Sequence, residues 1–165
     1  MQTPATVFLD THGIAYDVHR YEHDPAAASF GMEAAEVLGL DPDVVFKTLM
    51  AKLEGDGLDG DRGELVVAIV PVADMLDLKA LARAAGAKRA AMADVAAAER
   101  ATGFIAGGIS PFGQKKQHRT FIDETAEICD RVYISGGQRG LDISLIPADV
   151  IRATGAVVAP LATSR

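Results

Sequence analysis

The sequence predicts one α/β domain of the α+β type over residues 1–165. We expect a mixed, mostly antiparallel sheet that is curved or barrel-like and surrounded by helices. Segments with helix signals are interspersed with strand-like segments, and several strand pairs are joined by short turns, which favours antiparallel pairing. Hydrophobic residues make up 49% of the 165 residues, which is enough apolar surface for one sizeable core.

Five segments carry the start or stop signals of helices. Thr3-Pro4 opens the first with a capping hydroxyl and a proline in the first turn, and Gly13 ends it. Asp77 and Asp94 are expected to cap two later helices, and glycines follow several of the predicted helix ends. The predicted helices cover residues 4–12, 31–38, 78–85, 95–101 and 147–154.

Segments with alternating or β-branched side chains predict strands. The acidic, glycine-rich residues 54–64 are expected to form the loop of a hairpin, and residues 135–140 (SGGQRG) a tight turn between two further strands. The predicted strands cover residues 14–19, 44–53, 65–71, 90–92, 119–123, 131–135, 141–145 and 156–159.

Lys47 lies in the middle of the predicted strand VVFKTLMAKL, whose two faces are both mostly apolar. The strand is therefore expected to be covered on both sides, where an unpaired charge costs free energy. A functional lysine fits this pattern, and so does a lysine whose stem lies over apolar surface with its ammonium in water. We favour the functional interpretation, because lysine is seldom fully buried without a reason.

The stretch 102–116, TGFIAGGISPFGQKK, holds four glycines and ends in two lysines. Glycine allows positive φ and a close approach of the backbone to a ligand. Free N–H groups in such a loop can bind an anion or a polarised carbonyl oxygen. A glycine-rich turn that joins two strands and binds nothing fits equally well. The stretch is not a P-loop, because no Gly-Lys-Ser/Thr ending follows at the required spacing.

The charge distribution is uneven along the chain. The formal net charge is −7, yet residues 79–119 carry eight basic and two acidic residues, a local net charge of +6. A basic segment in an acidic protein fits a phosphodiester partner, and helix faces whose charges are scattered in space fit the same composition. The single cysteine and the lack of a basic leader or long apolar run predict a cytoplasmic protein with no membrane segment.

Several common catalytic and metal-binding patterns are missing from the sequence. It contains no HExxH, CxxC or GxSxG motif, and its four histidines lack metal-ligand spacing. The histidines are expected to be hydrogen-bonded surface or turn residues. We expect no metal and no cofactor.

Six motifs follow one another along nearly the whole chain. They are YEHDP (21–25), FKTL (46–49), PVADMLDLKAL (71–81), MAD (92–94), TGFIAGGISPFGQKK (102–116) and SGGQRGLDI (135–143). Together they resemble the YbaK/EbsC family, which groups stand-alone aminoacyl-tRNA deacylases with the editing domain inserted in bacterial prolyl-tRNA synthetases.

The resemblance implies hydrolysis of the ester that joins a wrong amino acid to the 3′ adenosine of a tRNA. It points to Cys-tRNA(Pro) as the substrate, with Cys-tRNA(Cys) as a further one, and to prolyl-tRNA synthetase as a partner. A small pocket discriminates by only about 10–200-fold per methylene-sized difference, so a second hydrolytic check is needed. The resemblance also implies that the thiol of the substrate attacks its own carbonyl.

The same resemblance implies a set of site residues. Lys47 corresponds to the essential lysine of FKTL and is expected to hold the terminal phosphate or ribose. The backbone of Gly107 and Gly108 is expected to stabilise the developing oxyanion, and Asp142 to bind the amino group. The expected substrate-binding residues are Tyr21, Phe30, Thr48, Ile109, Ser110, Ser135, Gly136 and Asp142.

Two alternative functions remain open at this stage. One is a deacylase for Ala-tRNA(Pro) or another small amino acid that uses a bound water. The other is a module that binds aminoacyl-tRNA or the synthetase without hydrolysing anything, since a lysine that only binds phosphate would leave the same pattern. A Lys47→Ala protein that still binds tRNA would separate binding from chemistry.

Overall fold

The computed structural model describes residues 2–27, 29–55 and 63–164. The helices are α1 (Pro4–Thr11), α2 (Phe30–Leu38), α3 (Leu78–Ala85), α4 (Val95–Thr102), α5 (Pro147–Thr154) and the 3₁₀ helix η2 (Glu124–Ile128). Thr3, Asp77 and Asp94 accept N-cap hydrogen bonds and Gly39, Gly86 and Gly103 are left-handed C-caps, as predicted, whereas α1 ends at His12. Ser29 caps α2 and Gly155 ends α5, which has no side-chain cap at its start. None of the described helices is long and apolar enough to cross a membrane.

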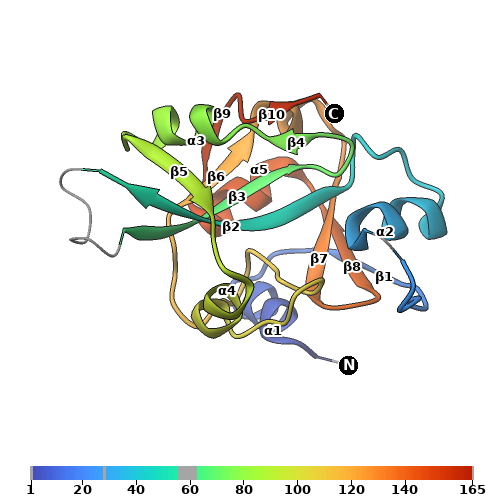
Figure 1. The fold of residues 1–165 in the computed structure, drawn as a ribbon. Coiled ribbons are helices and arrows are strands. Elements are labelled where there is room, and N and C mark those ends of the chain that lie inside the picture. The colour runs from blue at the N-terminus through green and yellow to red at the C-terminus, as the bar shows by residue number, and fades with distance from the viewer. Residues whose placement is uncertain (1, 28, 56–62, 165) are drawn as a thin grey trace.

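A five-stranded sheet forms the centre of the molecule (Figure 1). Its strand order is β5-β2-β3-β6-β9, and the pairs β3–β6 and β6–β9 are parallel whereas the others are antiparallel. The strands are β2 (Phe46–Glu54), β3 (Glu64–Pro71), β5 (Arg89–Met92), β6 (Thr120–Asp123) and β9 (Val157–Ala159). The sheet is therefore mixed, as the sequence predicts.

Two smaller sheets complete the fold. One has the order β1-β8-β7, with β1 (Asp17–Arg20), β7 (Val132–Gln138) and β8 (Leu141–Leu145), and the other pairs β4 (Met75–Leu76) with β10 (Ala162–Thr163). The described strands form three separate sheets and no closed barrel, so the barrel-like part of our prediction is not confirmed.

The core lies on both faces of the central sheet. Phe46, Met50 and Ile69 pack on the face that also contains α1, α4 and α5. Ala51 and Val70 pack on the opposite face, where α3 covers the sheet (Figure 1). The expectation that β2 is covered on both sides is confirmed. Because β2 is a central strand with few exposed side chains, the direction of each of its side chains is fixed by the pairing with β3.

The edge of β2 that faces away from β3 is only partly paired. At its start, the Tyr133 N–H of β7 donates to the Val44 carbonyl (3.0 Å), and Val45 forms a parallel bridge with Tyr133. Toward its other end, β5 pairs with β2 from Ala51 onward, and Ala93 N–H donates to the Met50 carbonyl (3.0 Å). We call the interval between β7 and β5 along this edge the β2 gap. It is the place where the sheets fail to close.

Two strand boundaries differ from the prediction by three residues. The turn expected over residues 135–140 is shorter: β7 continues to Gln138, with an irregular register between Ser135 and Gln138, and only Arg139 and Gly140 form the turn. Gly137 has φ +101°, so glycines that indicated a turn instead allow a bulged strand. The first strand starts three residues late, at Asp17. Most of the acidic connection 54–64 lies outside the described residues.

Candidate active site

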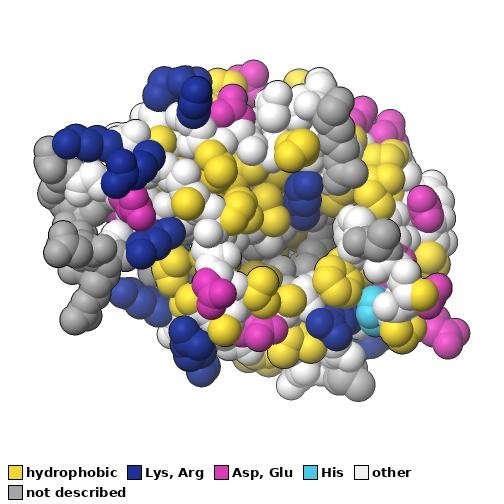
Figure 2. Space-filling view, in the orientation of Figure 1, with side chains coloured by type: hydrophobic (Ala, Val, Ile, Leu, Met, Phe, Trp, Pro, Cys, Tyr) yellow, Lys and Arg dark blue, Asp and Glu magenta, His cyan; other side chains and the backbone are white. Residues whose placement is uncertain are grey.

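A cavity of about 380 Å³ opens at the β2 gap. Figure 2 shows this face of the molecule hollowed near its centre, with hydrophobic side chains around the hollow. The walls come from elements far apart in the sequence. The lining residues are Tyr21, Ser29, Phe30, Gly31, Ala34, Val45, Phe46, Lys47, Thr48, Leu49, Met50, Met92, Ala93, Val95, Ala98, Ala106, Gly107, Ile109, Ser135 and Asp142.

The cavity brings together most of the residues that the sequence predicts for the site. Those that line it are Tyr21, Phe30, Lys47, Thr48, Gly107, Ile109, Ser135 and Asp142. Gly108, Ser110 and Gly136 are outside its lining. The Gly108 N–H donates to the Ile105 carbonyl (2.9 Å), so this N–H is engaged in a turn of the loop and does not offer itself to an oxyanion.

Ser110 and Gly136 lie outside the cavity and make hydrogen bonds in the segments that form its walls. Ser110 is fully buried, and its Oγ accepts the Phe112 N–H (3.3 Å). The Gly136 carbonyl accepts the Thr3 hydroxyl (2.5 Å), which ties the start of α1 to the bulge of β7. Both residues therefore support the glycine loop or the hairpin rather than face the cavity.

The exposed edge of β2 supplies backbone groups to the cavity. The carbonyls of Val44 and Met50 point to this edge, and residues two apart in a strand point the same way. Thr48 therefore directs its N–H and C=O groups into the β2 gap, and the Phe46 carbonyl points the same way beyond the bridge of Val45 with Tyr133, while Lys47 pairs with Val70 of β3. A ligand in the gap meets a row of donors and acceptors that the fold leaves for it.

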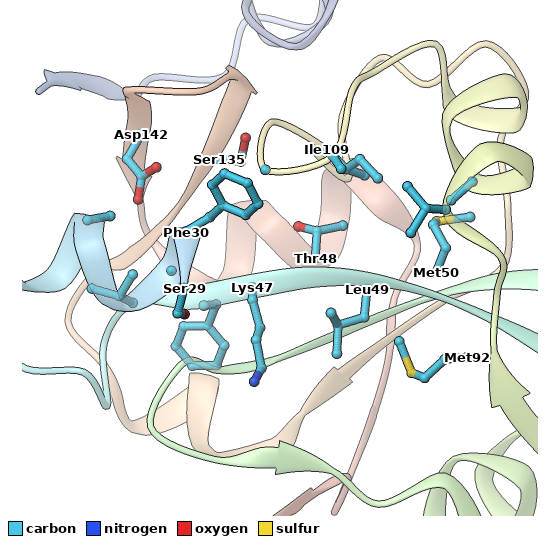
Figure 3. Close-up of a pocket in the computed structure, with 18 of the residues that line it drawn as sticks. Ser29, Phe30, Lys47, Thr48, Leu49, Met50, Met92, Ile109, Ser135 and Asp142 are labelled. Atoms are coloured by element: carbon cyan, nitrogen blue, oxygen red, sulfur yellow. The ribbon is translucent and has the colours of Figure 1, made fainter. Parts of the chain in front are cut away.

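Lys47 and Thr48 leave β2 in opposite directions (Figure 3). Thr48 points to the side of Ser135 and Ile109, whereas Lys47 points to the side of Leu49 and Met92. The Thr48 Oγ1 is buried, and the described part of the chain provides it with no hydrogen-bond partner. A buried hydroxyl without a partner costs free energy, which makes Thr48 a natural contact for a bound ligand or water.

Asp142 provides the acidic group of the cavity. It lies in β8 opposite Ser135 of β7, and its side chain is 7% exposed. Burial raises the pKa of this carboxyl to about 6. Burial and the nearby carboxylates of Asp142 and Glu33 raise the pKa of Tyr21 to about 12. The cavity therefore holds an ionised carboxylate at neutral pH beside a phenol that keeps its proton, which suits an ammonium group and a hydrogen-bond acceptor respectively.

Phe30 and Gly107 meet at the mouth of the cavity. Gly107 has φ +85°, and a Cβ placed on it would lie 2.7 Å from the Phe30 ring. The ring therefore lies directly on the Gly107 backbone, at a distance that only glycine permits. Both the backbone conformation and the ring contact explain why glycine occupies this position.

Replacing Gly107 with alanine is expected to lower activity about tenfold or more, because the new methyl group displaces Phe30 and the loop backbone. Gly86→Ala is the matched control, since Gly86 has φ +75° and open space around it. Both variants bear the cost of a left-handed alanine, about 1–2 kcal/mol. Thermal denaturation should show a loss in both variants, whereas the activity of the site should fall only in Gly107→Ala. Equal activity of the two variants would show that the ring contact does not matter.

Three polar residues at the site have roles that the sequence did not reveal. His23 Nδ1 contacts Glu33 Oε1 (2.8 Å), and Glu33 Oε2 accepts the Asp24 N–H (2.7 Å), which fastens the YEHDP segment to α2. The hydrogen bond from His23 lowers the pKa of Glu33. Arg139, in the β7–β8 turn, contacts both Phe30 and the glycine loop. The only sequence signal for His23 and Arg139 was their place inside two of the motifs.

The Lys and Arg side chains gather mainly on one side of the hollow in Figure 2, the side where Figure 1 places α3, β5 and the far end of the β2–β3 hairpin. Arg89 pairs with Glu54 (2.6 Å) and Arg119 pairs with Glu64 (2.9 Å). The charges of the basic segment 79–119 are therefore partly neutralised by this hairpin, while its other cations are exposed.

The six motifs imply an enzyme that acts on aminoacylated RNA, and comparison with known proteins supports this class. A family model described as "Aminoacyl-tRNA editing domain" matches residues 24–153. The chain is 33% identical over 164 residues, covering 98% of it and 94% of the relative, to EbsC of Enterococcus faecalis, a candidate Cys-tRNA(Pro)/Cys-tRNA(Cys) deacylase. The chain belongs to the aminoacyl-tRNA editing family and is an aminoacyl-tRNA deacylase.

Solved structures share the fold over its full length. A crystal structure of a hypothetical protein has a TM-score of 0.83 at 20% identity, covering 98% of this chain and 100% of that one. A crystal structure of a candidate trans-editing enzyme for prolyl tRNA synthetase has a TM-score of 0.81 at 24% identity, covering 99% of each chain. At these identities the likeness shows the fold alone.

Proposed function

We propose that this deacylase removes cysteine from Cys-tRNA(Pro), with Cys-tRNA(Cys) as a second substrate. The main support is the 33% identity, over 98% of the chain, to a relative described as a candidate deacylase of these two substrates. The cavity is consistent with a small aminoacyl group, since its volume is about 380 Å³. Asp142 offers a polar contact within it, and so does the Thr48 hydroxyl, which has no hydrogen-bond partner among the described residues.

Each of these residues is proposed to contact a different part of the substrate. Asp142 accepts hydrogen bonds from the α-ammonium of the aminoacyl group, and Thr48 binds the ester through its hydroxyl or its edge backbone groups. Lys47, on the other side of β2, holds the ribose or terminal phosphate. Tyr21 and Phe30 pack against the adenine or the amino-acid side chain. The Gly107 backbone N–H stabilises the negative charge that develops on the carbonyl oxygen.

The chemistry needs no nucleophile from the protein. The substrate sulfur attacks the carbonyl carbon, a C–S bond forms, and the bond to the ribose oxygen breaks. The ribose oxygen takes up the proton that the thiol loses. Water then opens the four-membered thiolactone and releases free cysteine. The site contributes by holding the sulfur and the carbonyl carbon in an attack geometry.

The exposed cations of the basic segment 79–119 are proposed to meet the phosphates of the acceptor stem. Nothing in the cavity distinguishes one tRNA from another, so we propose that prolyl-tRNA synthetase presents tRNA(Pro) to this enzyme. The fold it shares with a candidate trans-editing enzyme for prolyl tRNA synthetase agrees with this partnership.

The test is single-turnover deacylation of four substrates on the same tRNA(Pro), carrying cysteine, 2-aminobutyrate, alanine or proline. The 2-aminobutyryl group has nearly the size of cysteine but lacks the thiol. The expected result is that only Cys-tRNA(Pro) is hydrolysed. Equal loss of cysteine and 2-aminobutyrate would replace the thiol mechanism with attack by a bound water. If none of the four aminoacyl-tRNAs is hydrolysed although tRNA still binds, the protein is a binding module and the proposal is overturned.

A further inference from the structure

Arg139 joins three segments at the mouth of the cavity. It is an exposed residue in the β7–β8 turn, yet its guanidinium faces inward over the start of α2. Its Cζ lies 5.1 Å from the centroid of the Phe30 ring, and its Nε–H donates to the Ala106 carbonyl (2.7 Å). Both the flat face and the Nε–H donor of the side chain are therefore engaged within the protein.

Ala106 is held from a second side by α4. Its N–H donates to Glu99 Oε2 (2.8 Å), while its carbonyl accepts from Arg139. The Ala106 carbonyl and the Gly107 N–H belong to one peptide group, and no described peptide bond is cis. In a trans peptide the N–H points opposite to the carbonyl. Arg139 therefore fixes the direction of the Gly107 N–H, and Glu99 holds the preceding peptide group in place.

Gly108 explains how the loop comes within reach of Arg139. A Cβ on Gly108 would lie 3.0 Å from backbone atoms of Gln138 and Arg139, so the loop backbone packs directly on the hairpin turn. The neighbouring Gly107 carries the Phe30 ring in the same manner. The two adjacent glycines therefore allow two contacts, one with α2 and one with the hairpin, and Arg139 bridges both.

We propose that Arg139 is a positioning residue for deacylation, with Glu99 as its counterpart on the opposite side of Ala106. Arg139 sets the orientation of the Ala106–Gly107 peptide and presses Phe30 onto it, so that the Gly107 N–H meets the carbonyl oxygen of the substrate. This inference rests on the proposed function. It differs from a role in attracting RNA, because a positioning role requires the planar shape and the Nε–H of arginine and not only its charge.

Arg139→Lys is the decisive variant, because it retains the charge and loses the Nε–H and the flat face. Arg152→Lys is the control, since Arg152 is an exposed arginine of α5 that pairs with Asp149 (2.9 Å). We expect Arg139→Lys to lower the single-turnover rate at saturating enzyme by about tenfold or more. The enzyme concentration that gives half of the maximal rate should change little. Glu99→Ala, which removes the acceptor of the Ala106 N–H, should lower the same single-turnover rate, and Arg152→Lys should leave it unchanged.

Two kinetic outcomes would overturn the proposal. Full activity in Arg139→Lys would show that charge alone suffices. The other outcome is a change only in the enzyme concentration that gives half of the maximal rate, with a size that depends on salt concentration. It would show that Arg139 binds RNA phosphates instead.

Hydrogen exchange of the free protein tests the same contact without any substrate. The amides of residues 105–109 should exchange faster in Arg139→Lys than in wild type and in Arg152→Lys, while the amides of β3 remain protected. Unchanged exchange would overturn the inference. If the wild type hydrolyses no aminoacyl-tRNA but the exchange effect is present, the proposed function fails and the structural role of Arg139 stands.

Discussion

Replacing Lys47 with alanine is expected to reduce the rate of deacylation by about a hundredfold or more, since positioning of the ester and its charge are lost together. Lys47 is half-buried, its backbone is paired with Val70 of β3, and its side chain points to the side of β2 that Leu49 and Met92 share (Figure 3). Because strand pairing fixes the direction in which the Lys47 side chain leaves β2, a neighbouring residue does not readily take over the role of its ammonium.

Two variants control for loss of fold and for loss of charge. Lys47→Met retains most of the apolar stem, so its thermal stability should stay near that of the wild type while its activity falls as in Lys47→Ala. Lys52→Ala removes a cation farther along β2, outside the lining of the cavity, and should retain most of the activity. The measurement is single-turnover deacylation of Cys-tRNA(Pro) with tRNA affinity determined separately. Activity within threefold of the wild type in Lys47→Met would remove Lys47 from the mechanism.

Replacing Asp142 with asparagine is expected to stabilise the fold and weaken activity at the same time. Burial raises the pKa of this carboxyl from 3.8 to about 6, so the ionised form is unfavourable in the folded protein. At neutral pH the asparagine variant should gain up to about 3 kcal/mol in the free energy of unfolding. Its deacylation rate should fall about tenfold or more, because a neutral amide binds the ammonium group weakly.

The stability gained in Asp142→Asn is expected to depend on pH. A carboxyl whose pKa is raised on folding holds its proton longer in the folded state, so stability falls as pH rises from about 4 to about 6 and changes no further above that range. The advantage of Asp142→Asn should therefore vanish near pH 4 and be complete above pH 6. Asp130→Asn, at an exposed position, is the control for replacing an aspartate with asparagine. A constant difference at all pH values would contradict a buried, titrating Asp142.

The activity of the wild type should depend on the same group in the opposite sense. Protonation of Asp142 below about pH 6 removes the carboxylate that binds the ammonium, so kcat/KM should decline as pH falls through this value. The decline should be absent in Asp142→Asn. The two profiles together separate the binding role of Asp142 from its cost in stability.

The helices could be predicted from the sequence because their signals are local. Asp77 and Asp94 mark the starts of α3 and α4, and Gly39 and Gly86 mark the ends of α2 and α3. The hairpin of β7 and β8 was predicted, but its turn was placed too early, since Gly136 and Gly137 serve a bulge. Glycine pairs permit both structures, and only the pairing partner, here Leu141 and Asp142, decides between them.

Closure of the sheet could not be predicted, because it depends on contacts between distant strands. The bridge of Val45 to Tyr133 and the pairing of Ala51 with Met92 determine where the β2 gap begins and ends. No periodic pattern in either segment reveals such partners. The barrel-like expectation is not confirmed, and the cavity lies at this incompletely paired edge.

The site residues were inferred from a resemblance, and the structure gathers most of them around one cavity. Lys47 and Thr48 are adjacent, so strand alternation alone places them on opposite faces. Asp142 and Phe30 come near them only through the fold. Arg139 and Glu99 are a solvent-exposed arginine and a partly buried glutamate, and such residues leave no pattern that distinguishes a positioning contact from an ordinary surface charge.

The β2 gap also has a consequence for self-association. An incompletely paired strand edge is a template on which a strand of another molecule can add. The interval from Phe46 to Met50 would extend roughly 13 Å at about 3.3 Å per residue, which is long enough for a short strand to add. Val95 of α4 and Ile109 of the glycine loop line this opening and stand in the way of an incoming chain. Variants that displace the loop should therefore aggregate more readily, and a bound substrate should protect them by occupying the same edge.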